Sequence, residues 1–213
     1  MPSRNNLVFV LLSISLISIQ TSAQQSSTGS SSSKTKSSTQ HAKPAPSTGN
    51  SDEGTYHNPT FGITYRVRYG WVDRTRQMQD ENSDPSKSQL LLAVFERPPE
   101  ATGESVNSAV IIAAESIASY PGLKTAADYM GPLTELTTGK GFKVVHEPYE
   151  FLVGTQPLVR CDYMKDLGKL VMHQSSLVRL EKGFIVSFTF IGGSEDEVEE
   201  LMEKLSVSNA KPR

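Results

Sequence analysis

Four strand-like segments follow one another near the end of the chain, and only very short connections separate them. The connections are Gly154-Thr155, Asp166-Leu167-Gly168 and Glu181-Lys182-Gly183. Loops of this length permit antiparallel hairpins, whereas a parallel crossover needs about a dozen residues or more. The sequence therefore predicts an antiparallel meander, with strands at residues 142–153, 156–165, 169–180 and 184–191.

Two apolar runs precede this meander, and neither alternates between polar and apolar residues. Residues 89–96 read QLLLAVFE and residues 108–114 read SAVIIAA. Continuous runs rich in branched side chains are typical of central strands that are covered on both faces. We therefore expect an α+β fold, in which an antiparallel sheet of six to seven strands carries helices on its faces, as in an α/β/α sandwich.

The first of two predicted helices covers residues 125–137. Apolar residues recur there at helical spacing, and Thr125 with Asp128 has the spacing of a capping box. Pro132 lies inside this segment, where it removes a backbone donor and crowds the preceding turn. We therefore expect the helix to kink or split at this proline.

A second helix is predicted near the end of the chain, where Ser194 and Glu197 have the spacing of a capping box. Its expected buried stripe comprises Val198, Leu201, Met202 and Leu205. Glu195, Glu199 and Glu203 recur every four residues on another face. Such an acidic ladder is typical of a solvated outer face rather than of a ligand set.

Residues 61–69 alternate strictly between apolar and polar side chains. A period of two predicts a strand with one buried face. That face would consist of Phe61, Ile63, Tyr65, Val67 and Tyr69. Pro148, in the first strand of the meander, is expected at an edge or a bulge because proline cannot donate to a strand ladder.

The first 23 residues have the layout of a secretory signal peptide. Arg4 supplies the basic start, residues 7–19 are apolar apart from three serines, and small residues lead up to Ala23. A membrane-spanning helix needs about 20 apolar residues, so we expect cleavage after Ala23, with retention as an anchor as the alternative. The mature chain would then have no transmembrane segment and would be periplasmic or secreted.

Residues 24–54 differ sharply in composition, since fourteen of these 31 positions are Ser or Thr and none is aromatic. Such a segment buries too little apolar surface to offset its ordering entropy. It predicts a disordered linker, with a binding arm as the alternative, and residues 55–213 then form one globular domain. The chain has a net charge of −2 although its linker is mildly basic, so the domain itself is acidic. An acidic domain argues against a nucleic-acid partner.

The start of the globular part carries a recognisable pattern. Tyr56, Asn58 and Phe61 match a Tyr-x-Asn-x-x-Phe opening, and Gly70-Trp71 matches a Gly-Trp pair that ends a first strand. With these residues the chain resembles the PsbP-like domain family, which includes the photosystem subunit PsbP, the yeast Ran-release factor Mog and DcrB-type envelope proteins. The resemblance implies an exported or accessory protein that binds something, and it implies no shared active site.

Tyr56, Arg66, Arg68 and Trp71 are the candidate surface for a ligand or partner. Aromatic and arginine side chains are favoured binding anchors. The alternative is structural. Trp71 would then fill part of the core, and the two arginines would lie on the solvent-exposed face of a strand. Tyr69 stands where the family usually has a proline, so we expect the strand exit to differ.

The sequence predicts no catalytic residue, no metal ligand and no cofactor. No serine lies in a Gly-x-Ser-x-Gly motif, and Cys161, the single cysteine, is expected to be a buried, inert thiol rather than a reactive nucleophile. His57, His146 and His173 lack the spacings that bring two metal ligands together.

We therefore expect an exported, non-enzymatic accessory or binding module of the cell envelope, monomeric, with a protein or a small ligand as its partner. The alternatives are a hydrolase or metal-dependent enzyme with a site assembled from distant residues, and a passive envelope component. An exposed aromatic patch without a pocket would favour a partner surface. A pocket would favour a ligand or an enzyme if it gathered two or more of Arg66, Arg68, His146, Asp162 and His173.

Overall fold

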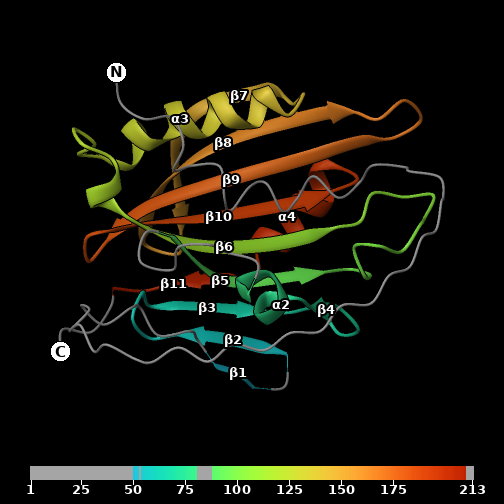
Figure 1. Cartoon of the computed structure of the whole chain (residues 1–213), viewed down its shortest axis with the longest axis horizontal. Helices are drawn as coiled ribbons and strands as arrows, with labels where there is room; N and C mark the ends of the chain where they lie inside the picture. The colour runs from blue at the N-terminus through green and yellow to red at the C-terminus, as the bar shows by residue number, and fades with distance from the viewer. Residues whose placement is uncertain (1–49, 53, 81–87, 210–213) are drawn as a thin grey trace, which may run out of the picture.

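The computed structural model describes residues 50–52, 54–80 and 88–209, and these form an α+β fold (Figure 1). The predicted signal peptide, its cleavage site at Ala23 and residues 24–49 lie outside the described residues. The strands are β1 (Asn50–Asp52), β2 (Thr55–Asn58), β3 (Ile63–Arg66), β4 (Val72–Asp73), β5 (Ser88–Phe95), β6 (Ala109–Ser116), β7 (Lys143–Val153), β8 (Gln156–Asp166), β9 (Val171–Glu181), β10 (Phe184–Gly192) and β11 (Leu205–Val207). The helices are α2 (Thr75–Asp80), the 3-10 turn η2 (Ile117–Ser119), α3 (Ala126–Gly139) and α4 (Glu195–Met202).

Within the described residues, seven strands form the main sheet in the order β4-β5-β6-β10-β9-β8-β7. Every neighbouring pair is antiparallel. The meander from β7 to β10 is confirmed, and β5 and β6, the two continuous apolar runs, are almost wholly buried. The predicted α+β class with a six- to seven-stranded antiparallel sheet is therefore confirmed.

A smaller sheet, with the order β1-β2-β3-β11 in the described part of the chain, was not expected from the sequence. The strand predicted at residues 61–69 is shorter than expected, because β3 covers only Ile63–Arg66. The predicted burial of Tyr69 is wrong, since this side chain is 105% exposed. The chain turns away after β3, and Gly70 adopts a left-handed φ of 82°.

Gly62 allows the start of the domain to lie directly against its C-terminal segment. Its φ is 64°, and a Cβ at this position would lie 2.3 Å from the carbonyl oxygen of Ser208. The amide of Ser208 in turn donates to the carbonyl of Gly62 at 2.9 Å, beside the pairing of β11 with β3. Only glycine allows this close approach of two backbones.

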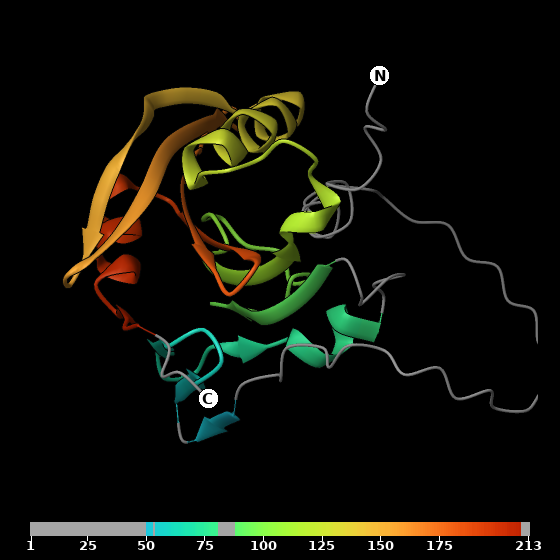
Figure 2. The same ribbon diagram turned by 90° about the vertical axis from the view of Figure 1, so that its left-hand side faces the viewer.

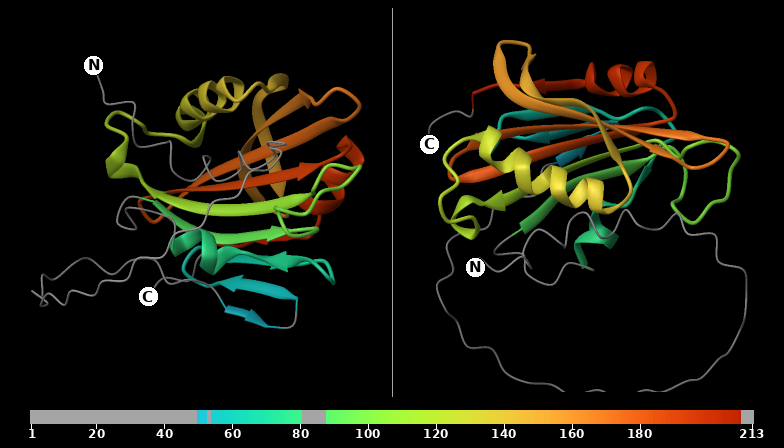
Figure 3. Two further views of the ribbon diagram at one scale, coloured as in Figure 1. Left: turned by 45° about the vertical axis from the view of Figure 1, so that its right-hand side comes forward. Right: turned by 90° about the horizontal axis from the view of Figure 1, so that it is seen from above.

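Helices α2 and α3 cover one face of the main sheet, whereas α4 and the smaller sheet cover the other face. The right panel of Figure 3 shows α3 on one side of the strands, with α4 and β11 on the other. One core lies under α2 and α3, and a second core lies between the main sheet, α4 and the smaller sheet. The buried stripe predicted for the last helix is confirmed, since Val198, Leu201, Met202 and Leu205 all belong to this second core.

Helix α3 begins with the predicted capping box, in which Thr125 and Asp128 each accept from the other's backbone amide. Of the predicted kink or split at Pro132, the split is wrong, because α3 runs through the proline to Gly139. Pro132 and Asp128 are both exposed, so water can hydrate the carbonyl that the proline leaves without a donor. None of the helices among the described residues has the length and apolar character to cross a membrane.

Candidate functional site

A polar cleft with a volume of about 130 Å³ opens between α4 and the β7–β8–β9 end of the main sheet. Figure 2 shows α4 close to the β7–β8 hairpin, which bends toward it. The side chains come from β7, β8, β9 and α4, so segments distant in sequence build the site together. The lining comprises Val145, His146, Tyr149, Arg160, Asp162, Tyr163, His173, Gln174, Ser175, Glu195, Val198 and Glu199.

The alternation of side chains along β8 decides which residues reach the polar cleft. Successive residues of a strand point to opposite faces. Arg160 and Asp162 therefore point toward α4, whereas Cys161 and Tyr163 belong to the core under α3. Asp162 lies directly opposite Ser175 of β9 in the sheet register, so the three polar side chains share one face.

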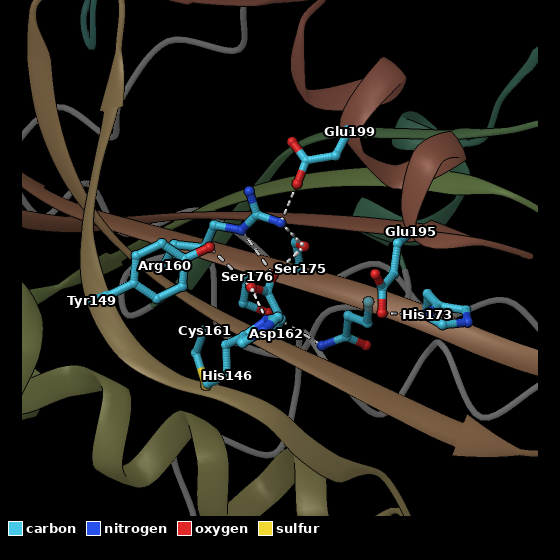
Figure 4. Close-up of polar contacts among 11 residues, drawn as sticks. His146, Tyr149, Arg160, Cys161, Asp162, His173, Ser175, Ser176, Glu195 and Glu199 are labelled. Atoms are coloured by element: carbon cyan, nitrogen blue, oxygen red, sulfur yellow. Dashed lines mark hydrogen bonds and ion pairs between the residues drawn. The ribbon is translucent and has the colours of Figure 1, made fainter.

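Arg160 is the central residue of the polar cleft (Figure 4). Its Nε donates to Asp162 Oδ1 at 2.7 Å, and its Nη2 donates to Glu199 Oε1 at 2.5 Å and to Ser175 Oγ at 3.2 Å. The guanidinium also lies over the ring of Phe151, 4.9 Å from its centroid. Burial by itself lowers the pKa of Arg160, but the hydrogen bonds to Glu199 and Asp162 outweigh it, so the pKa is raised and the charge is secured.

Asp162 collects several donors in a buried position. Besides Arg160, the hydroxyl of Ser175 donates to Oδ1 at 2.5 Å and the hydroxyl of Tyr149 donates to Oδ2 at 3.0 Å. His146 Nδ1 lies 3.3 Å from Oδ2. Burial, together with the nearby charge of Asp162, raises the pKa of Tyr149 to about 12. The carboxylate is therefore a well-satisfied buried acceptor that orients four neighbours.

The three glutamates of the acidic ladder of α4 are exposed, as predicted for a solvated face, but two of them also contact polar side chains of the sheet. Glu199 bonds Arg160, and Glu195 lies 3.8 Å from His173 Nδ1 on β9. Glu203, at the end of the helix, is exposed as expected. The periodicity of α4 predicts its buried stripe correctly. However, strands β7 to β9 extend beyond this stripe, so they also contact the side of the helix that carries Glu195 and Glu199.

The surface residues predicted from the sequence lie outside the polar cleft. Tyr56 is 2% exposed in the core, where its hydroxyl accepts from Asn58 Nδ2 at 3.0 Å. Trp71 is half-buried against the same core. Arg66 is exposed, and Arg68 forms an ion pair with Glu200 of α4 at 2.5 Å. The predicted surface position of Tyr56 is wrong because this side chain is buried in the core, and a partner contact at Arg66, Arg68 and Trp71 stays a prediction.

Three of the five polar residues that the sequence offered for a pocket do meet in the polar cleft: His146, Asp162 and His173. Arg66 and Arg68 do not line it. The sequence analysis did not single out Arg160, Tyr149 and Ser175, and it assigned Glu199 to a solvated helix face. The available signal was the pair of charged residues on either side of Cys161, in a strand that is otherwise largely apolar.

Among the described residues, three large apolar side chains that remain exposed lie on β7: Val145, Tyr149 and Leu152. β7 is an edge strand, and its register with β8 shifts on both sides of His146, the second shift spanning Pro148. The predicted placement of Pro148 at an edge and a bulge is therefore confirmed. Since Val145 and Tyr149 also line the polar cleft, the exposed apolar residues and the pocket adjoin each other.

The expected burial of Cys161 is confirmed. Its thiol faces away from the polar cleft and donates to the backbone carbonyl of His146 at 3.3 Å. Burial raises the pKa of this thiol, so the reactive thiolate is disfavoured. In the part of the chain that the structure describes, no three His, Cys, Asp or Glu side chains converge as a metal site.

No protein-family model and no curated protein matches this chain. Similar solved structures include the cyanobacterial PsbP of Synechocystis, with a TM-score of 0.44 and 17% identity over 69% of this chain and 87% of the other. They also include LpqN of Mycobacterium tuberculosis, described as involved in cell envelope biogenesis, with a TM-score of 0.41 and 13% identity over 68% of this chain and 83% of that one.

A protein of unknown function from Pseudomonas aeruginosa is a further similar structure, with a TM-score of 0.34 and 14% identity over 47% of this chain and 68% of the other. At such identities and TM-scores, a likeness carries no information about ligand or activity. The PsbP-like family that the sequence resembles is thus present among the similar structures, and the chemistry of the site has to come from the residues of the polar cleft.

Proposed function

We propose that this chain is an exported, non-enzymatic binding module of the cell envelope that holds a small polar ligand in the polar cleft. The observation that carries the proposal is the convergence of Arg160 and Asp162 of β8 with Glu199 of α4 on one cavity. Hydrogen bonds to a preorganised, partly buried charge cluster are the usual source of specificity in small-ligand sites. The signal-peptide pattern of residues 1–23 supports the export part.

The hydrogen-bond pattern favours binding over hydrolysis. A serine nucleophile needs a base that accepts its proton and a third group that orients the base. Here Ser175 donates directly to Asp162, and His146 also lies against Asp162, so the histidine does not stand between them. Cys161, the other nucleophile type near the cleft, faces the core under α3.

The proposal is tested by NMR titration of the purified protein with a panel of amino acids, sugars and small organic acids and amines. Saturable shifts of the backbone signals of His146, Arg160 and Glu199 are expected for at least one compound class. The proposal fails if no compound shifts these signals. The non-enzymatic part fails if the protein hydrolyses an activated ester such as p-nitrophenyl acetate and the variant Ser175→Ala does not.

A further inference from the structure

The guanidinium of Arg160 keeps one nitrogen open toward the polar cleft. The side chain is only 9% exposed, and Nε and Nη2 make all of its hydrogen bonds to the described residues. Figure 4 shows the other terminal nitrogen, Nη1, without a contact to the residues drawn. A guanidinium carries donors in a fixed fork, so Nη1 is oriented to donate to a ligand oxygen.

Two carboxylates of α4 face the same space. Glu199 uses one oxygen for Arg160, and its side chain is 48% exposed, so the second oxygen can accept from a ligand. Glu195 stands one helical turn earlier and also lines the cleft. Because Asp162 already balances the charge of Arg160, the two glutamates make the mouth of the cleft acidic.

The cleft therefore presents a cationic donor and an anionic acceptor side by side, joined by the Arg160–Glu199 pair. A ligand carboxylate at Nη1 and a ligand ammonium at Glu199 would each form a charge-assisted hydrogen bond. A ligand with only one charge would form only one of these two hydrogen bonds. Complementarity thus favours opposite charges on neighbouring atoms of one ligand.

The size of the cleft limits the rest of the ligand. Its volume of about 130 Å³ is well below the roughly 300 Å³ at which pockets for cofactor-sized molecules begin. The ring of Tyr149 and the side chains of Val145 and Val198 supply apolar lining. A charged head group with a short apolar side chain fits these limits.

We propose that the polar cleft binds a small zwitterion, namely an α-amino acid with a short side chain. Its carboxylate accepts from Arg160 Nη1, and its ammonium donates to Glu199, with Glu195 as the neighbouring acidic group. This inference rests on the proposed binding function and names the class of ligand for it.

The test is an NMR titration of the purified protein with three probes of similar size: alanine, propionate and ethylamine. Alanine carries both charges, whereas propionate carries only the carboxylate and ethylamine only the ammonium. We expect saturable shifts at Arg160 and Glu199 with alanine, and affinities at least about tenfold lower for the other two probes, since each loses one charge-assisted hydrogen bond. Equal affinity for either single-charge probe would overturn the zwitterion assignment.

Two variants of neighbouring residues on α4 provide a matched control. Glu199→Gln and Glu200→Gln each neutralise an exposed glutamate that bonds an arginine at 2.5 Å, but only Glu199 lines the cleft. We expect Glu199→Gln to weaken alanine binding about tenfold and Glu200→Gln to leave it unchanged. Equal weakening by both variants would also contradict the proposal.

The titration separates this inference from the broader proposal. If alanine gives no saturable shift while another compound of the panel does, the zwitterion assignment fails and the binding function stands. If no compound of the panel shifts the signals of the cleft, both fail.

Discussion

The two faces of strand β8 differ in role, although their residues alternate along one segment. On one face, Cys161 and Tyr163 are buried under α3, and the hydroxyl of Tyr163 meets Thr134 Oγ1 at 2.8 Å. On the other face, Arg160 and Asp162 are buried almost as deeply, yet they carry charges and are held by other polar groups. The first face is packed for stability, whereas the second retains a cavity beside its charges.

A second comparison, between two glutamates of α4, shows how burial distinguishes two ion pairs of equal length. Glu199 and Glu200 each lie 2.5 Å from an arginine. The arginine of Glu199 is 9% exposed and is fixed by Asp162, whereas Arg68, the partner of Glu200, is 29% exposed and lies at the surface. Surface pairs of the second kind contribute little because solvent screens them. The difference identifies Arg160 rather than Arg68 as the arginine with a preorganised environment.

The largest effect is expected on the polar face, from Asp162→Ala. The change removes the buried carboxylate partner of Arg160, which then keeps only the half-exposed Glu199, and it leaves the hydroxyls of Ser175 and Tyr149 without their acceptor. We expect a loss of about 3 kcal/mol in the free energy of unfolding. Urea unfolding followed by circular dichroism measures it.

The control for this change is the double variant Arg160→Met with Asp162→Leu. It removes both charges and should recover most of the lost stability, because apolar replacements of similar volume need no partner. A loss below about 1 kcal/mol for Asp162→Ala alone would mean that the pair is solvated and that the contrast between the two faces is overstated.

On the packed face, Tyr163→Phe is expected to cost about 1 kcal/mol, because loss of the hydroxyl leaves Thr134 with only its longer contact to Cys161 Sγ at 3.9 Å. The measurement is again the free energy of unfolding in urea. A double-mutant cycle with Thr134→Val isolates the pairwise contribution. Ligand affinity in the polar cleft should stay unchanged, and a large change would show that the two faces are coupled.

Tyr149→Phe makes the matched change on the polar face and is expected to cost less, about 0.5 kcal/mol. Asp162 keeps its bonds from Arg160 and Ser175 when the hydroxyl of Tyr149 is lost, and Tyr149 is partly exposed. The phenol with a pKa of about 12 should disappear from an ultraviolet pH titration of the variant. A greater loss of stability than for Tyr163→Phe would reverse the ranking of the two hydroxyls.

The smallest effect concerns Lys140, just after α3. Burial, with Lys165 as the second cause, lowers its pKa from 10.5 to about 8. Between these values the unfolded chain binds more protons than the folded one, so the free energy of unfolding should gain a small positive contribution as pH rises from about 8 to 10.5. Lys140→Met should remove this contribution, as urea unfolding at pH 7.5 and pH 10 would measure. A variant with the same pH slope as the wild type would contradict the assignment.

The meander could be predicted because its information is local. Glycine-containing connections of two to four residues leave antiparallel pairing as the only choice for β7 to β10, and the periodicity of α4 identifies its buried stripe. The smaller sheet was missed because β11 pairs with β3, far away in the sequence, and is only three residues long. Short segments of this kind carry too little periodicity to be recognised.

The candidate site, like the fold, could be predicted only in part from the sequence. The sequence offered His146, Asp162 and His173 as polar groups for a pocket, but the distances between them depend on the register of β7, β8 and β9. Arg160 was not named because a charged residue on a strand is usually solvated. Its burial results from the position of α4 across the strands, which no local pattern encodes.

The sequence by itself determined the antiparallel sheet, the two longer helices and the apolar stripe of α4, because hydrogen-bonding periods and turn residues act over a few positions. Tertiary structure decided that Arg160, Asp162, Ser175 and Glu199 meet, and that Tyr56 is buried while Tyr69 is exposed. The physical reason is that packing of α4 and the smaller sheet on one face sets the local environment of each side chain. A charge becomes a site only when neighbours from other elements bury it and leave one of its donors free.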